Sequence, residues 1–235
     1  MKALILAAGL GTRLAPITND RPKSLVTVNG VPILFKQIEN LHENGITDIT
    51  VISGYKAEVL ESEVHAKWPE IKIINSIDYA NTNNMYSAYL GKDAVAGSDF
   101  LMMNADVFYD SSVIKALLAF ESANAIVTEI GQYIEESMKV IETDGRLVSI
   151  SKQVPAEDAY GTTIDVYKFS NIGGAAFFEK CREYIEDKKE LTQWSEVALN
   201  EILPEVIFKA CPLDGRWLEI DNLDDLVAAE KLFKD

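Results

Sequence analysis

The chain has 235 residues, of which 48% are hydrophobic and 25% are charged, and its formal net charge is -15. This length and composition suit one globular domain with a buried core. Because a broadly acidic surface repels polyanions, nucleic acid and anionic membranes are excluded as main partners.

The first predicted element is a strand at residues 3–7. This short run is apolar without alternation, as expected of a strand buried on both faces of a parallel sheet. The run ends before Gly9, which favours a buried strand over a secretory signal peptide. No later stretch approaches the ~20 apolar residues of a membrane span. We therefore expect a cytoplasmic protein.

Strands and helices are predicted to alternate as far as residue 130. Apolar runs predict strands at residues 49–52, 71–74, 100–103 and 125–130. Helices are predicted from residues 84–94 and from three apolar stripes: Leu34, Ile38 and Leu41; Leu60, Val64 and Trp68; Val113, Leu117 and Phe120. This alternation is typical of an α/β sheet.

The pattern changes after residue 130. The pair Asp144-Gly145 between two apolar runs predicts a β-hairpin. A strand is expected at residues 163–169, a helix with Cys181 on its buried face, and a packed helix at the end of the chain. Cys181 and Cys211 are too few and too far apart for a disulfide scaffold or a zinc site.

A glycine-rich segment follows the first strand. Gly9 and Gly11 let the backbone turn tightly and present N–H groups to an anion. Arg13 can hold phosphate oxygens in bidentate fashion, and Lys23, delivered after Pro22, adds a compact positive charge. The segment is neither a P-loop nor a dinucleotide fingerprint, which would need a glycine at Leu14. The alternative is a plain glycine turn with solvated cations.

Residues 7–14 together with Pro22 and Lys23 resemble the signature of the nucleotidyltransferases that make nucleotide-sugars and CDP-alcohols. Asn104-Ala105-Asp106, Lys152 and Glu219-Ile220-Asp221 extend this resemblance over most of the chain. Within that superfamily, residues 79–87 are similar to a segment of phosphocholine cytidylyltransferases.

The resemblance implies an α/β fold with a Rossmann-like mixed, mainly parallel sheet, helices on both faces and an inserted antiparallel acceptor-binding region. We expect one domain, 1–235. Its nucleotide-binding part would be 1–130 and its acceptor-binding or lid part 131–216. Residues 217–235 would supply a metal-ligand strand end and the closing helix.

Two aspartates are implied to bind Mg²⁺. Asp106 follows a predicted strand, at the edge where ligands of open α/β sheets gather, and Asp221 lies near another strand end. The alternatives are that Asp106 is a turn residue and that Asp221 caps the final helix. The resemblance also places Lys152 against the acceptor phosphate, although Ser151 and Gln153 replace the residues that often flank this lysine, and a surface role is the alternative.

The remaining candidate residues concern nucleotide and acceptor binding. The predicted nucleotide-binding residues are Leu6, Ala8, Gly9, Gly11, Thr12, Gly54, Asn83, Asn84 and Ser87. The amides and the hydroxyl suit a pyrimidine edge, but Asn84 as a helix cap is an equal alternative. The predicted acceptor-binding residues are Tyr160, Tyr167, Trp194, Trp217 and Glu219. Aromatic faces hold a quaternary ammonium, although most aromatic residues are simply core.

The predicted function is a Mg²⁺-dependent cytidylyltransferase that joins CTP to phosphocholine or a similar small phosphorylated alcohol and releases pyrophosphate. Arg13, Lys23 and Lys152 would act in catalysis, and the partners would be a nucleoside triphosphate and a phosphorylated acceptor. Residues 160–170 look closer to relatives that act on phosphonates or other phosphorylated acceptors, so a 2-aminoethylphosphonate cytidylyltransferase is one alternative. A sugar-1-phosphate uridylyl- or thymidylyltransferase and a non-catalytic nucleotide-binding regulator are the others. The sequence leaves the oligomeric state open.

Overall fold

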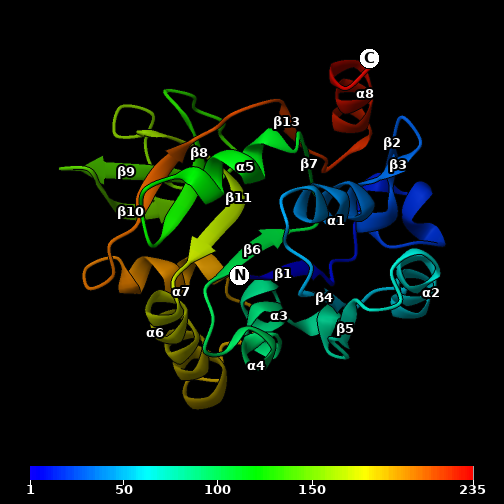
Figure 1. Cartoon of the computed structure of the whole chain (residues 1–235), viewed down its shortest axis with the longest axis horizontal. Coiled ribbons are helices and arrows are strands. Elements are labelled where there is room, and N and C mark those ends of the chain that lie inside the picture. Colours follow the sequence, from blue (N-terminus) through cyan, green and yellow to red (C-terminus); the bar gives the residue numbers. More distant parts are fainter. Residues whose placement is uncertain (235) are drawn as a thin grey trace.

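The computed structural model describes residues 1–234, and a nine-stranded sheet runs through the molecule (Figure 1). Its parallel part has the order β6-β1-β4-β5. These strands are β1 (Lys2–Ala7), β4 (Ile49–Ser53), β5 (Lys72–Asn75) and β6 (Phe100–Asn104). The predicted strands of the first hundred residues are therefore confirmed.

The second part of the sheet is mostly antiparallel. It contains β8 (Ala125–Ile130), β9 (Lys139–Thr143), β10 (Arg146–Ser151), β11 (Gly161–Phe169) and β12 (Lys209–Pro212). β11 pairs antiparallel with β6, β8 and β9, and so joins the two parts, while β12 runs parallel to β8. The predicted hairpin is confirmed, because Asp144 and Gly145 both have positive φ, as a tight primed turn requires.

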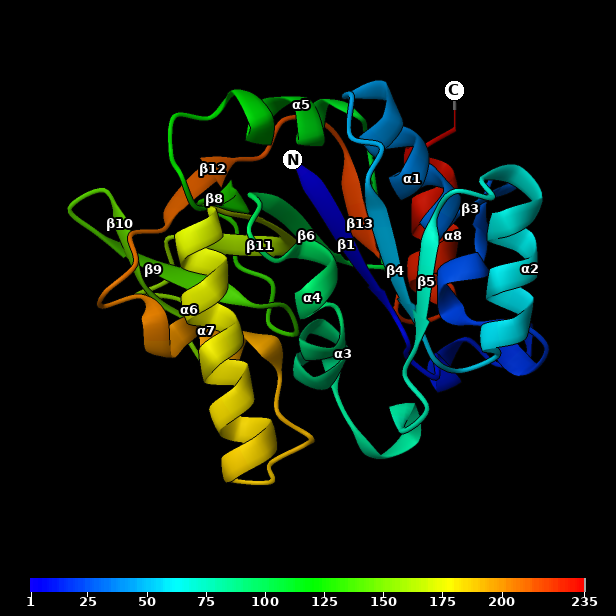
Figure 2. The same cartoon turned by 60° about the horizontal axis from the view of Figure 1, so that its bottom comes forward.

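Helices cover both faces of the parallel strands. Ala3, Ile5 and Ala7 of β1 pack into one core cluster, whereas Leu4 and Leu6 pack into another. The first cluster receives α1 (Ile33–Glu43), α2 (Ala57–Lys67) and α5 (Ser112–Ala119). The second receives α3 (Asn84–Leu90), α6 (Asn171–Arg182) and α7 (Ser195–Ile202). Figure 2 shows α3 and α6 on the opposite side of these strands from α1 and α2. The predicted fold class is thereby confirmed.

The helix predicted over residues 84–94 is interrupted. Gly91 separates α3 from α4 (Lys92–Val95). A Cβ on Gly91 would lie 2.4 Å from a methyl carbon of Leu4, so glycine allows this segment to approach β1 closely. Cys181 is buried as predicted, and the helix that carries it continues into a short π-helical turn, Glu183–Asp187.

Two short sheets and a third core cluster complete the fold. β2 (Thr27–Val28) pairs with β3 (Val31–Pro32), and β7 (Val107–Tyr109) pairs with β13 (Trp217–Glu219). The third cluster packs Leu14 against the closing helix α8 (Leu223–Leu232) through Leu226 and Ala229.

Within residues 1–234, no helix combines the length and the apolar character that a membrane crossing requires.

Candidate active site

A cavity of about 380 Å³ opens at the carboxyl ends of β1 and β6. Ligands of open α/β sheets bind at this edge. The predicted site residues on its wall are Leu6, Ala8, Gly9, Gly11, Thr12, Arg13, Lys23, Asn83, Asn84, Ser87, Asp106, Lys152, Trp194, Glu219 and Asp221. The structure therefore brings together residues that lie far apart in the sequence.

The glycine loop is shaped around Lys23. Gly11 has φ 63°, and a Cβ there would lie 2.7 Å from the Cβ of Lys23. Glycine is therefore required both by the backbone conformation and by the close approach of the lysine. The Thr18 hydroxyl donates to the Gly11 carbonyl at 2.9 Å, which holds the loop closed behind Lys23.

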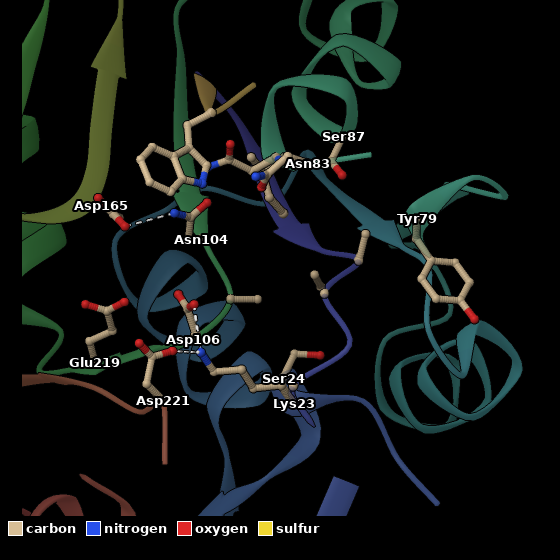
Figure 3. A pocket seen from close by; sticks show the side chains of 18 of the residues that line it. Lys23, Ser24, Tyr79, Asn83, Ser87, Asn104, Asp106, Asp165, Glu219 and Asp221 are labelled. Carbon is tan, nitrogen blue, oxygen red and sulfur yellow. Dashed lines mark hydrogen bonds and ion pairs between the residues drawn. The ribbon is translucent and has the colours of Figure 1, made fainter. Parts of the chain in front are cut away.

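Lys23 lies between two carboxylates, as Figure 3 shows. Its Nζ donates to Asp106 at 2.9 Å and to Asp221 at 2.6 Å, and Arg13 reaches Asp221 at 2.9 Å. Burial alone would lower the pKa of Lys23, but the two aspartates outweigh it and raise that pKa. Burial alone would raise the pKa of Asp221, but Lys23 and Arg13 hold it below its ordinary value.

The pairing of β13 with β7 delivers Asp221 to Asp106. Glu219 pairs with Val107, and the Ile220 N–H donates to the Asp106 carbonyl at 2.9 Å. The capping alternative for Asp221 is wrong, because Asn222 is the N-cap of α8 and forms a capping box with Asp225. Asp221 is thus left to face the cavity.

Asp106, Glu219 and Asp221 form an acidic group that fits a hard cation. One carboxylate oxygen from each lies within 4.8 Å of the others, and Asp106 Oδ1 is buried without a hydrogen-bond partner. Burial and repulsion by Asp106, Asp165 and Asp221 raise the pKa of Glu219 to about 8. Oxygen ligands crowded in this way suit Mg²⁺. Glu219, which was predicted to bind the acceptor, lies in this acidic group.

Two asparagines connect the wall to the acceptor half. Asn83, not Asn84, is the N-cap of α3, because its side chain accepts from the Asn84 N–H at 2.8 Å. Asn84 Oδ1 instead accepts from the Ser195 N–H at 2.8 Å.

Gly54 lies outside the wall, where a Cβ would meet the Ala8 carbonyl oxygen at 2.7 Å. Gly54 was predicted to bind the nucleotide, but it supports the glycine loop from behind instead.

Lys152 lies on the wall at the end of β10, with its Nζ 5.1 Å from the centre of the Trp194 ring. The buried Lys139 fixes this part of the chain, because its Nζ donates to the Lys152 carbonyl at 2.5 Å and to the Glu135 carbonyl at 2.7 Å. Lys152 is therefore held at the cavity rather than on a distant surface.

The four aromatic residues predicted to bind the acceptor do not surround the cavity together. Trp194 is the only one of the four on the cavity wall. Tyr167 is buried in the second core cluster, and Tyr160 packs against that cluster. Trp217 packs against the first cluster and donates to Glu129 at 2.8 Å. At these three positions the aromatic side chains pack in or against the core, as most aromatic residues do.

Sequence reasoning missed Asn104, Asp165 and Glu196 as wall residues. Asp165 has φ 56° where the register of β11 shifts, and Asn104 Nδ2 donates to it at 2.9 Å (Figure 3). A charged residue between Ile164 and Val166 in an apolar strand was the available signal. Glu196 gave none, because acidic residues are common in the first turn of a helix.

Residues 2–233 match the model of the nucleotidyl transferase family. The chain belongs to this family. The CTP:phosphoglutamine cytidylyltransferase of Campylobacter jejuni is 29% identical over 248 residues, covering 96% of this chain and 98% of that protein. The choline-phosphate cytidylyltransferase of Streptococcus pneumoniae is 48% identical over 98 residues, which cover 42% of each chain.

Solved structures share the fold over nearly the whole chain. The CTP:phosphocholine cytidylyltransferase of Streptococcus pneumoniae matches with a TM-score of 0.83 and 26% identity over 99% of each chain. The inositol-1-phosphate CTP transferase of T. maritima matches with a TM-score of 0.80 and 19% identity, a likeness of fold alone. The chain spans about half of some longer relatives, such as 51% of a bifunctional IPC transferase and DIPP synthase of Aquifex aeolicus.

Proposed function

We propose that the chain is a Mg²⁺-dependent cytidylyltransferase that joins CTP to a small phosphorylated alcohol such as phosphocholine, with release of pyrophosphate. The observation that carries this proposal is the convergence of Arg13, Lys23, Asp106 and Asp221 beside the glycine loop. Membership of the nucleotidyl transferase family supports the reaction class. The cytidylyltransferases among its relatives support the choice of CTP.

The reaction exchanges one phosphoanhydride bond for another by in-line displacement. An oxygen of the acceptor phosphate forms a bond to the α-phosphorus of CTP, and the bond from that phosphorus to the β-phosphate bridging oxygen breaks. Pyrophosphate leaves with the electron pair. A phosphate monoester dianion is already a nucleophile near neutral pH, so no general base is required, and alignment and charge neutralisation carry the catalysis.

The glycine loop, the three cations and the two aspartates on the wall each have a role in this scheme. The backbone N–H groups at Gly9 and Gly11 and the guanidinium of Arg13 hold the triphosphate. Lys23 stabilises negative charge at the α-phosphate, and Lys152 orients the incoming phosphate. Asp106 and Asp221 would hold Mg²⁺, which when bound neutralises phosphate charge.

The proposal is tested by measuring pyrophosphate release from CTP, UTP and dTTP, each with phosphocholine, 2-aminoethylphosphonate and glucose 1-phosphate. We expect release with CTP and a small phosphorylated acceptor. Asp106→Asn should reduce it at least about 100-fold, whereas Asp224→Asn, an exposed residue of α8, should not.

Three results would overturn parts of the proposal. Preference for UTP or dTTP with glucose 1-phosphate would favour a sugar nucleotidyltransferase. Tight CTP binding without pyrophosphate release would favour a regulator. Full activity of Asp106→Asn would remove the assigned metal site.

A further inference from the structure

A second acidic feature lies on the cavity wall, separate from the group at Asp106. Glu196, in the first turn of α7, is 3% exposed and lines the cavity, and its Oε2 atom is buried without a hydrogen-bond partner. Asp165 of β11 lines the same cavity. A buried carboxylate oxygen that lacks a partner is costly, so it indicates a ligand group that supplies one.

Tyr167 links these two acids from behind. Its hydroxyl lies 2.9 Å from Asp165 Oδ1 and 2.7 Å from Glu196 Oε1. One hydroxyl hydrogen can serve only one carboxylate at a time. Asn104 donates to the other oxygen of Asp165 at 2.9 Å, and Tyr167 itself is buried. The tyrosine and the asparagine therefore fix both carboxylates in place but do not neutralise them.

No lysine or arginine within residues 1–234 forms an ion pair with Asp165 or Glu196. Lys152, which lines the same cavity, lies over the Trp194 ring instead. Burial, together with repulsion from Glu196 and Asp106, raises the pKa of Asp165 to about 7. Ionising Asp165 beside Glu196 is therefore costly while the cavity is empty, and a cation bound next to both groups would favour the charged form of Asp165.

We propose that Glu196 and Asp165 bind a primary ammonium group at the far end of the acceptor. This inference rests on the proposed function, and it defines the acceptor as a short molecule with a phosphate or phosphonate at one end and an –NH₃⁺ group at the other. Lys152 would meet the anionic end, and the face of Trp194 would cover the methylene groups between the two ends.

A primary ammonium fits better than the two other groups considered. A quaternary ammonium has no N–H to donate to Glu196 Oε2 and is held by several aromatic faces, whereas only Trp194 of the four predicted aromatic residues lies on this wall. A neutral hydroxyl could donate a hydrogen bond but would leave the charge of the acids uncompensated.

Binding of three acceptors, measured calorimetrically with Mg²⁺ and a non-hydrolysable CTP analogue present, tests the inference without requiring turnover. The probes are phosphoethanolamine, phosphocholine and 2-hydroxyethyl phosphate, which share the phosphate end. We expect phosphoethanolamine to bind about 10- to 100-fold more tightly than either of the others, as charge-assisted hydrogen bonds of this kind predict.

A variant of Glu196 assigns that preference to this acid. Glu196→Gln should weaken phosphoethanolamine binding about 10- to 100-fold and leave 2-hydroxyethyl phosphate binding unchanged, because a glutamine oxygen still accepts from a hydroxyl. Glu201→Gln, an exposed position on the same helix, is the matched control and should change neither. Thermal melting confirms that both variants fold.

The inference would be overturned by equal affinity for phosphoethanolamine and 2-hydroxyethyl phosphate, or by a Glu196→Gln variant that keeps the full preference for phosphoethanolamine. Phosphocholine binding as tight as that of phosphoethanolamine would replace the primary ammonium by a quaternary one and so also contradict it. A protein that shows the expected binding but releases no pyrophosphate would instead refute the proposed reaction and leave this subsite intact.

Discussion

At the scale of single residues, Lys23 is central to the candidate site. In the structure it forms ion pairs with Asp106 and Asp221, the two carboxylates that we propose as metal ligands. The same ammonium group would be available to a phosphate once a cation takes its place between the acids. Lys23 would thus hold the two carboxylates together before substrate arrives and stabilise the negative charge of the phosphate afterwards.

Replacing Lys23 tests its role in catalysis. Lys23→Met keeps an unbranched side chain, one heavy atom shorter, but removes its charge, so we expect kcat for pyrophosphate release to fall at least about 100-fold. Lys115→Met, at an exposed position on α5, is the matched control. If both variants retained wild-type kcat, Lys23 would have no role at the α-phosphate.

Asp165 should make stability depend on pH. Its folded-state pKa is raised to about 7 from an ordinary value of 3.8. Between these values the folded state holds a proton that the unfolded state has lost, so raising the pH from about 4 to about 7 destabilises the fold, by at most about 1.4 kcal/mol for each pH unit. Above pH 7 the effect is complete.

Denaturant unfolding of the metal-free protein and of Asp165→Asn across this pH window measures that effect. The variant has no carboxyl group at this position, so its stability should rise relative to wild type as the pH increases from 4 to 7. A constant difference between the two proteins would show that Asp165 does not titrate in this range.

At the scale of elements, the site depends on close approaches between loops. The glycine loop after β1 packs on Lys23, and β13 lies beside β7 so that Asp221 reaches Asp106. The loop was predictable because its residues are adjacent in sequence and have few backbone options. The position of Asp221 beside Asp106 was predictable only through family resemblance, because nothing local in the sequence specifies the β13–β7 pairing.

Other elements show where sequence reasoning fails. The aromatic residues predicted to bind the acceptor have ordinary strand or loop patterns, and tertiary packing turns Tyr167 into the core, where its hydroxyl holds Asp165 and Glu196. The register shift in β11 that places Asp165 on the wall has no sequence signature comparable to Asp144-Gly145. Polar residues whose positions depend on pairing between strands far apart in the sequence are thus the least predictable part of the site.

Substitution of Gly11 tests the loop packing. Gly11→Ala introduces both a positive φ at a non-glycine residue and a contact 2.7 Å from the Cβ of Lys23. We expect a loss of unfolding free energy of about 2 to 4 kcal/mol and a strong loss of CTP binding. Gly45→Ala is the matched control, because Gly45 has φ 78° but open space around a Cβ.

The control should show the conformational cost alone, about 1 kcal/mol, with unchanged CTP binding. Denaturant unfolding and nucleotide titration measure the two effects. Equal losses in both alanine variants would mean that the approach of Lys23 does not constrain the loop.

At the scale of the whole molecule, the three cations proposed to act in catalysis lie in one cavity of an acidic protein. The formal net charge is -15, yet Arg13, Lys23 and Lys152 all line that cavity. β11 joins the two parts of the sheet, and both residues 1–130 and residues 131–216 contribute to the wall. We therefore expect a nucleotide triphosphate on one side of the cavity and its phosphorylated acceptor on the other.

The fate of the α-phosphorus tests this account most directly. CTP labelled at that phosphorus is incubated with the protein, Mg²⁺ and phosphoethanolamine or phosphocholine, and the products are separated. The account predicts that the label moves with cytidine into a diphosphate-linked product containing the acceptor, with an equal amount of unlabelled pyrophosphate. Label that stays in CTP, or that appears only in CMP or CDP, would contradict it.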